Sequence, residues 1–342
     1  MEKNKKISEE EIKKILNDNY DIVANQVEEI NRGTADIFKI IADKGKYILK
    51  YFSEGRTKES VIKETNIIDF LNQRNIKVPV YIRTNSGDFY MSYNNRIIVL
   101  QEFIEGYTME NNTGDYKKVI ESATILGKMT KALEDYQGLR EEGIFKKSFS
   151  KESIENGIIK MKDLQKKLKE DNPYKEEFYN DLKFKIDVAE ELLEKFDFGI
   201  IDKMTIKNTH GDYSVQQLIY NDEGETTVID FETAKKMPII WEIMRSYSYV
   251  DKEVVNGELN IDTLTEYVKE FSKYIKLNKY DLKYAAHLYL IQLISSTFGY
   301  KQFNEDYTKE PLLEFARFRT KLCKYLYKNL ENISYRLLYE VK

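Results

Sequence analysis

The chain has 342 residues, of which 42% are hydrophobic and 33% are charged, and its net charge is -4 at pH 7. This mild charge does not favour a nucleic-acid-binding protein. The single cysteine, Cys323, excludes an intrachain disulfide and a cysteine metal cluster, and it fits a reducing compartment. No apolar run reaches the roughly 18 residues that a membrane span requires, and the first residues are charged. We therefore expect a cytoplasmic protein that binds neither nucleic acid nor membrane.

The first 105 residues predict a small α+β region. A short amphipathic helix comes first, with Ile12, Ile15 and Leu16 on one face. Strand patterns separated by turns follow on both sides of one longer helix. In chain order the predicted elements are the helix 8–19, the strands 26–30, 37–42 and 47–52, the helix 58–72, and the strands 80–84, 88–93 and 96–103.

Beyond Gly106 the hydrophobic pattern is helical. Val119, Ala123 and Leu126 begin a clear apolar stripe at helical spacing. The predicted helices cover residues 116–136, 150–168, 174–196, 238–250, 262–276, 280–299 and 309–337, and a hairpin lies at 206–232. The chain length favours about two domains. We expect the boundary between residues 105 and 106.

The segment 208–232 carries the most specific chemistry in the chain. Asp212 follows directly after His-Gly, and Gln217 comes five positions later. A strand pattern, a turn and a second strand pattern then lead to Asp230. This order predicts that the three side chains lie close together at one end of a hairpin. Phosphoryl transfer requires one carboxylate to orient a hydroxyl and oxygen ligands to hold magnesium on the nucleotide phosphates.

This segment resembles the catalytic centre of the aminoglycoside phosphotransferase and choline kinase superfamily, which has His-Gly-Asp, four residues, Asn, and then Ile-Asp-Phe. The resemblance implies an α+β, bilobal protein-kinase-like fold, with a small antiparallel-sheet lobe before a larger, mainly helical lobe. Residues 1–105 would form the nucleotide-binding lobe with its hinge, and 106–342 the catalytic and substrate-binding lobe. The implied activity is an ATP- and magnesium-dependent kinase that phosphorylates a hydroxyl of a small molecule.

At two positions of the segment 208–232 this chain differs from a known kinase motif: position 217 differs from the superfamily motif, and position 232 differs from the protein-kinase motif. Gln217 stands where the superfamily has Asn, so its amide oxygen lies one methylene further out. Glu232 follows Asp-Phe, as is common in the small-molecule branch, where protein kinases have Gly. By the resemblance, Asp212 orients and deprotonates the acceptor hydroxyl, while Asp230 and Gln217 hold magnesium.

The resemblance also implies a nucleotide site in the first region. Lys50 would position the α- and β-phosphates, and Glu64 would be its ion-pair partner, with Glu59 as the rival. Gly33 lies in a turn between the first two strands, where backbone N–H groups would cradle phosphate, although a simple hairpin turn is the alternative. The segment 100–106 resembles the interlobe hinge, where the main-chain groups of Glu102 and Ile104 would bond adenine.

Several other conspicuous residues have structural interpretations. The resemblance makes His210 a residue that orders the catalytic loop and not a general base. His287 lies in a helical stripe, and two distant histidines cannot form a histidine-rich zinc site. Trp241 fits core packing better than contact with a cationic substrate. Glu242 would brace the catalytic loop, with Arg245 as a neighbour.

The acceptor is the least determined part of the prediction. Asp230, Glu232 and Glu242 would give the cleft beside Asp212 a negative potential, which would attract a cationic molecule. We expect a small hydroxylated amine such as an aminoglycoside or an amino alcohol. Choline, ethanolamine, homoserine and other sugars stay open, as do the choice between ATP and GTP and the oligomeric state.

A non-enzymatic alternative also follows from the sequence. The stretch 83–106 is similar to kinase-like spore coat proteins and to the homoserine kinase branch. The chain could then be a catalytically weak or inactive kinase-like structural protein. Gln217 favours this alternative, whereas Lys50, Asp212 and Asp230 oppose it because all three charged groups are present.

Overall fold

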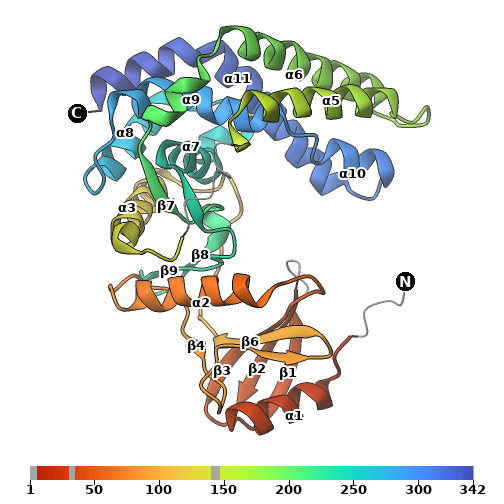
Figure 1. The fold of residues 1–342 in the computed structure, drawn as a ribbon, viewed down its shortest axis with the longest axis vertical. Helices are drawn as coiled ribbons and strands as arrows, with labels where there is room; N and C mark the ends of the chain where they lie inside the picture. Colours follow the sequence, from red (N-terminus) through yellow and green to blue (C-terminus); the bar gives the residue numbers. More distant parts are fainter. Residues whose placement is uncertain (1–5, 31–34, 140–146, 342) are drawn as a thin grey trace. The chain divides into compact units, whose positions relative to one another are not determined.

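The structure is a computed structural model that describes residues 6–30, 35–139 and 147–341 (Figure 1). The chain divides into two compact units. The first comprises Met1–Thr108, Asp135–Leu139 and Gln217–Ala234, and the second comprises Met109–Glu134, Arg140–Gln216 and Lys235–Lys342. None of the helices in the described ranges combines the length and the apolar character needed to cross a membrane.

The first unit is built on an antiparallel sheet with the strand order β1-β2-β3-β6-β4, and β5 also pairs with β6. The strands are β1 Ala24–Ile30, β2 Asp36–Ala42, β3 Gly45–Tyr51, β4 Tyr81–Ile82, β5 Met91–Tyr93 and β6 Arg96–Glu102. Helix α1 (Glu9–Tyr20) packs Ile12 and Leu16 into one core with Ile40 and Leu49 of the sheet. In the central register Lys50 of β3 lies opposite Val99 of β6.

Helix α2 (Lys58–Asn72) begins at Thr57, whose side chain accepts a hydrogen bond from the N–H of Ser60. Such an N-cap satisfies a backbone donor that would otherwise lack a partner. The buried face of α2 contains Val61, Ile68 and Leu71, together with the carboxylate of Glu64. The fold therefore places one acidic side chain of α2 inside the first unit.

A hairpin of β8 (Leu218–Tyr220) and β9 (Thr226–Val228) completes the first unit. Tyr107 and Tyr220 exchange two backbone hydrogen bonds of 2.9 Å, which join the hairpin to the chain just after β6. Gly106 makes this approach possible: its φ is +144°, and a Cβ there would lie 2.3 Å from the carbonyl oxygen of Tyr220. Any other residue at this position would separate the two segments.

The second unit is mainly helical. Its helices are α3 Tyr116–Ala132, α5 Lys151–Lys166, α6 Lys175–Lys195, α7 Ile239–Val250, α8 Ile261–Ser272, α9 Lys279–Ile294, α10 Tyr300–Glu305 and α11 Glu310–Glu340. Helices α5 and α6 run side by side, and α11 lies along α9 (Figure 1). Strand β7 (Ile206–Thr209) pairs antiparallel with β10 (Lys235–Pro238). Helix α7 is buried along almost its whole length, so it forms the centre of this unit.

The predicted α+β fold class is confirmed. The helix predicted at residues 58–72 has those bounds in the structure, and the predicted hairpin strands are present. The strand predicted at 80–84 is only Tyr81–Ile82, because the chain turns at Thr84, whose N–H donates to the carbonyl of Asp88. The pairing of β7 with β10 and the short helix α10 were not predicted. The functional boundary at residues 105 and 106 stays a prediction.

Candidate active site

The His-Gly-Asp loop of the second unit is held by a glutamate of helix α7. The Glu242 carboxylate accepts hydrogen bonds from the N–H groups of His210 at 3.1 Å and Gly211 at 2.6 Å. Glu242 is fully buried, and burial raises its pKa, while His210 and the two N–H groups act in the opposite direction. Gly211 has a φ of +83°, a conformation that glycine adopts without strain. The longer side chain of Glu242 therefore makes the contacts expected of a loop brace.

Arg245 lies one helical turn after Glu242 and contacts the next part of the loop. Its Nη2 is ion-paired with Oδ1 of Asp212, and its Nη1 donates to the carbonyl of Tyr213 at 2.7 Å. Burial opposes the charge on Arg245, but Asp212 together with Tyr249, Tyr289 and Glu242 outweighs it, so the pKa of the arginine is raised. The Asp212 side chain is 43% exposed. The result is an accessible carboxylate whose direction is fixed by a buried cation.

His210 is built into the loop. Its ring is completely buried, and its Nδ1 accepts the N–H of Asp212 at 3.4 Å. Tyr213 continues the loop into the core, where its hydroxyl donates to the carbonyl of Ser122 at 2.9 Å. These contacts fit the structural role predicted for His210, because its acceptor nitrogen faces the backbone.

Gln217 and Asp230 belong to the first unit and lie at the same end of the β8–β9 hairpin. The N–H of Ile229 donates to the carbonyl of Gln217 at 3.0 Å, so Gln217, just before β8, lies opposite the residue that precedes Asp230. Asp230 has a φ of +67°, which is uncommon outside glycine and is often found at functional sites. The closeness of Asp212 to this pair concerns two different units and stays a prediction.

The donor atoms at this end of the hairpin suit magnesium. A carboxylate and an amide oxygen are hard ligands, which magnesium prefers. In the described parts of the chain no group of three or more His, Cys, Asp and Glu residues could hold a metal alone. Magnesium bound by Asp230 and Gln217 would therefore complete its coordination with water and substrate phosphates, as it usually does.

Lys50 and Glu64 approach each other in the first unit. The Lys50 Nζ lies 4.0 Å from Oε1 of Glu64, and the two side chains are 18% and 3% exposed. The same Oε1 accepts the hydroxyl of Tyr81 at 3.0 Å. Burial, together with Glu64, raises the pKa of Tyr81 well above its ordinary value, so its hydroxyl stays protonated as a donor. Glu59 instead interacts with its own N–H and with Thr57 at the start of α2.

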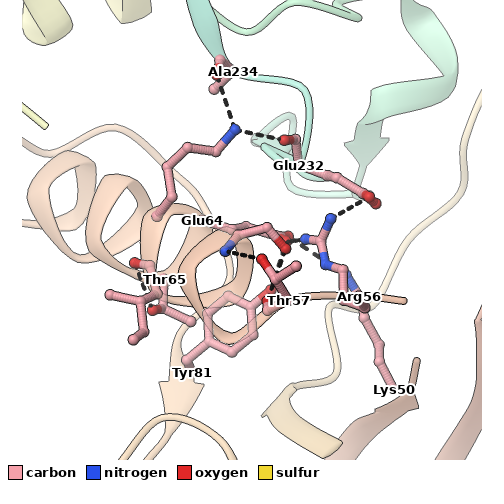
Figure 2. Close-up of polar contacts among 11 residues, drawn as sticks. Lys50, Arg56, Thr57, Glu64, Thr65, Tyr81, Glu232 and Ala234 are labelled. Atoms are coloured by element: carbon pink, nitrogen blue, oxygen red, sulfur yellow. Dashed lines mark hydrogen bonds and ion pairs between the residues drawn. The ribbon is translucent and has the colours of Figure 1, made fainter. Parts of the chain in front are cut away.

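A second cation, Arg56, contacts Glu64 and was missed by the sequence analysis (Figure 2). Its Nη2 lies 2.8 Å from Oε2 of Glu64, and its Nη1 is ion-paired with Glu232. Arg56 lies in the turn between β3 and α2, where hydrophobic periodicity gives no signal. The structure therefore places two cations at Glu64, of which Arg56 is the nearer.

The remaining predicted nucleotide contacts lie around the end of β6. Glu102 and Ile104 line a cavity of about 520 Å³ within the first unit, which Val78 and Thr227 also line. The N–H of Glu102 donates to the carbonyl of Val80 at 2.9 Å. An adenine contact from Glu102 would therefore have to use its carbonyl. Gly33 lies outside the described residues.

The predicted negative potential is weakened within each unit. Asp212 is paired with Arg245, and Glu232 with Arg56. Glu242 is buried and bonded to backbone N–H groups, so it faces the loop and not solvent. Of Asp230, Glu232 and Glu242, only Asp230 is still expected to attract a cationic molecule. Trp241 is 5% exposed, which fits the core packing expected for it.

His287 lies in α9, away from the loop, and provides a pH test of the fold. Its ring stacks on Phe196 with centroids 5.7 Å apart, and burial lowers its pKa to about 4. An exposed histidine in the unfolded chain titrates near pH 6.5, so the unfolded chain binds more protons between pH 6.5 and 4. The free energy of unfolding must therefore fall as the pH drops through this window.

We expect His287 to reduce the free energy of unfolding by about 2 kcal/mol between pH 7 and pH 5. A His287→Gln variant should lack this part of the loss. Denaturant unfolding of both proteins at the two pH values measures the difference. Equal losses in the two proteins would show that His287 is protonated as easily in the fold as in the unfolded chain.

Three solved structures that are similar to this chain have names that describe kinases or phosphotransferases of small molecules. The amicoumacin kinase hAmiN, in complex with AMP-PNP, Ca²⁺ and Ami, is 16% identical, with a TM-score of 0.64 over 95% of this chain and 94% of that one. Spectinomycin phosphotransferase APH(9)-Ia, in complex with ADP and spectinomycin, is 17% identical, with a TM-score of 0.63 over 97% and 98%. A microcompartment-associated aminopropanol kinase is 11% identical, with a TM-score of 0.61 over 95% and 98%. These likenesses establish the bilobal protein-kinase-like fold that the motif predicted.

The fold and the braced His-Gly-Asp loop define a kinase-like phosphotransferase. Residues 26–261 match the model of the phosphotransferase enzyme family, and the chain belongs to that family. The family match makes the chain a phosphotransferase. The search of curated proteins gives no significant match to the chain.

Proposed function

We propose that this protein transfers the γ-phosphate of ATP, in the presence of magnesium, to a hydroxyl of a small amine-bearing molecule. The observation that carries the proposal is Asp212, a half-exposed carboxylate held by Arg245 on a loop braced by Glu242. We place the activity in the cytoplasm, where ATP is available. The single cysteine, which is buried, fits that setting.

Asp212 would act on the acceptor. Its carboxylate accepts a hydrogen bond from the acceptor hydroxyl, directs that oxygen to the γ-phosphorus, and takes up the proton as the new O–P bond forms. The bond from the γ-phosphorus to the leaving ADP oxygen breaks in the same transfer. Arg245 keeps the carboxylate in place through the ion pair with its Oδ1. Positioning supplies much of the rate in such a reaction.

The nucleotide would be held by the first unit. Lys50 contacts the α- and β-phosphates, and Glu64 keeps the ammonium directed toward them. Asp230 and Gln217 would hold magnesium, which when bound neutralises charge on the phosphates. The hAmiN structure contains AMP-PNP with Ca²⁺, which supports the use of a nucleotide with a divalent cation in this fold. Glu102 and Ile104 would contact adenine through their main-chain groups.

The acceptor class rests mainly on the related structures. Their names specify spectinomycin, aminopropanol and ethanolamine as molecules bound or phosphorylated by proteins of this fold. The last two are amino alcohols. A cationic acceptor would be attracted by Asp230, although the other acids in the sites are paired. We therefore propose an aminoglycoside or an amino alcohol.

A phosphotransfer assay over a panel of acceptors tests the proposed function. The panel should contain aminoglycosides, spectinomycin, aminopropanol, ethanolamine, choline, homoserine, neutral sugars and a serine peptide, with ATP and magnesium. We expect turnover with at least one amine-bearing alcohol and a lower apparent affinity for it at higher salt. Phosphorylation of sugars or peptide alone would contradict the acceptor class. Nucleotide binding without any turnover would favour the inactive structural alternative.

Lys50→Met should raise the ATP concentration needed for half-maximal rate and should lower turnover. Glu64→Gln should do the same more weakly, because Tyr81 and Arg56 also hold that side chain. The double variant should lose less than the sum of the single losses, since both changes act through one pair. Steady-state kinetics of the three variants measure this coupling, with Glu59→Gln as the control. Additive losses would show that Glu64 does not support Lys50.

A further inference from the structure

Two cations from the region of α2 hold the segment that follows β9. Arg56, just before the helix, is ion-paired with the side chain of Glu232 and lies 2.8 Å from Glu64 (Figure 2). Lys63, inside the helix, donates to the carbonyl of Glu232 at 2.9 Å and to that of Ala234 at 3.1 Å. One contact reaches a side chain and the other reaches the backbone. Both cations therefore hold Glu232, each through a different part of the residue.

The residues just before these contacts include one with a strained backbone. Asp230 has a left-handed backbone, with φ +67°, a conformation that is strained outside glycine. It persists only where neighbouring contacts fix the chain on both sides. The Ile229 N–H bond to Gln217 fixes the chain before it, and the Lys63 and Arg56 contacts fix it after. Phe231, completely buried, anchors the middle.

We propose that Arg56 and Lys63 are positioning residues that seat the Asp230–Phe231–Glu232 segment on α2, so that the Asp230 carboxylate is directed for magnesium. This inference rests on the proposed function, in which Asp230 is a magnesium ligand. Arg56 also joins that segment to Glu64, the partner of Lys50. The phosphate contact and the metal ligand are thereby fixed to one helix.

The burial of Arg56 supports a role beyond a surface ion pair. Its side chain is 9% exposed, and that of Glu64 is 3% exposed, so this pair is largely removed from water. Glu232 is 42% exposed and lines, with Arg56, a cavity of about 430 Å³ that Thr57 and Ser60 also line. The planar guanidinium reaches both carboxylates at once, which the single ammonium of a lysine cannot match in geometry.

The experiment compares nucleotide affinity with and without magnesium. Isothermal titration with ADP, in magnesium and in EDTA, gives the gain that magnesium adds to nucleotide binding. Residues that orient metal ligands typically contribute about 10–100-fold to metal affinity. Arg56→Met and Lys63→Met should each lower the apparent magnesium affinity by about tenfold, and Lys63→Met, which leaves the Glu64 pair intact, should keep metal-free ADP binding within about twofold. Arg56→Lys should fall between Arg56→Met and the wild type.

Arg74→Met is the matched control, because Arg74 is an exposed arginine just beyond the other end of α2. It should behave as wild type. If Arg56→Met does not fold, Lys63→Met and Arg56→Lys carry the test. One outcome would overturn this inference alone: the folded Arg56 and Lys63 variants keep the magnesium affinity of the wild type, while Asp230→Asn loses magnesium affinity. No magnesium effect in the wild type, or none lost in Asp230→Asn, would overturn the proposed metal site as well.

Discussion

Asp212→Asn should lower phosphotransfer turnover by about 10²–10⁴-fold, the usual contribution of a general base. The asparagine has the same shape, and its amide oxygen can still accept a hydrogen bond from Arg245. It cannot take up the acceptor proton, and it has no charge to direct the hydroxyl. Nucleotide affinity should stay within about twofold, because Asp212 contacts the acceptor and not ATP in the proposed arrangement. Steady-state kinetics with the true acceptor and a nucleotide titration measure both quantities.

The control for this variant is Asp187→Asn. Asp187 is an exposed aspartate of α6 that is also paired with a cation, Lys183, at 2.8 Å. Its replacement removes the same charge and a similar ion pair, so it should leave turnover unchanged. Thermal unfolding of both variants separates a loss of chemistry from a loss of structure. An Asp212→Asn enzyme with wild-type turnover would show that another group activates the hydroxyl.

The elements that could be predicted are those whose pattern is local. Helix α2 was predicted with its observed bounds, because its apolar positions recur at helical spacing. The structure adds the N-cap at Thr57. The strands β8 and β9 were predicted because a turn with Gly224 separates two short apolar runs. By contrast, β7 was not predicted, because it contains the polar residues Lys207, Asn208 and Thr209 and has no apolar pattern. Its pairing with β10 joins segments that are distant in the sequence, so no local pattern indicates it.

The side-chain contacts of the candidate site were only partly accessible from sequence. The approach of Lys50 to Glu64 and the bond from Glu242 to the loop followed from the resemblance. The Arg56–Glu232 pair did not, because no local pattern tells which cation meets which carboxylate across the fold. The Arg245–Asp212 pair had one usable signal. Positions 242 and 245 are three apart and lie on the same face of a helix. If Glu242 contacts the loop, Arg245 is therefore expected to face the same loop.

These two arginines change how the charges of the site are understood. A count of acidic residues in the sequence predicted a negative cleft. The potential of an acidic residue also depends on neighbouring cations and on burial, which a count does not include. Arg56 neutralises Glu232, one of the counted acids, and Arg245 neutralises Asp212 itself, each within its own unit. Asp230 is the remaining acid of the motif with a predicted ligand role. The magnesium-dependent behaviour of the protein should therefore depend on that residue more than on any other carboxylate.

Asp230→Asn should remove most of the magnesium dependence of nucleotide binding and lower turnover by at least about 10²-fold, since charge neutralisation by a metal is worth several kcal/mol. Asparagine is the better replacement than alanine, because it tolerates the left-handed backbone observed at this position. An alanine variant would add backbone strain to the loss of the ligand. The asparagine variant therefore isolates the missing charge.

Gln217→Ala should have a smaller effect than Asp230→Asn, because an amide brings a dipole where a carboxylate brings a full charge to a hard cation. Gln217→Asn should be tolerated or should gain activity, since it restores the ligand of the superfamily motif. Magnesium titrations of turnover with all three variants rank the two positions. An essential Gln217 beside a dispensable Asp230 would reverse the proposed metal site. It would also show that the left-handed backbone of Asp230 serves the hairpin and not the metal.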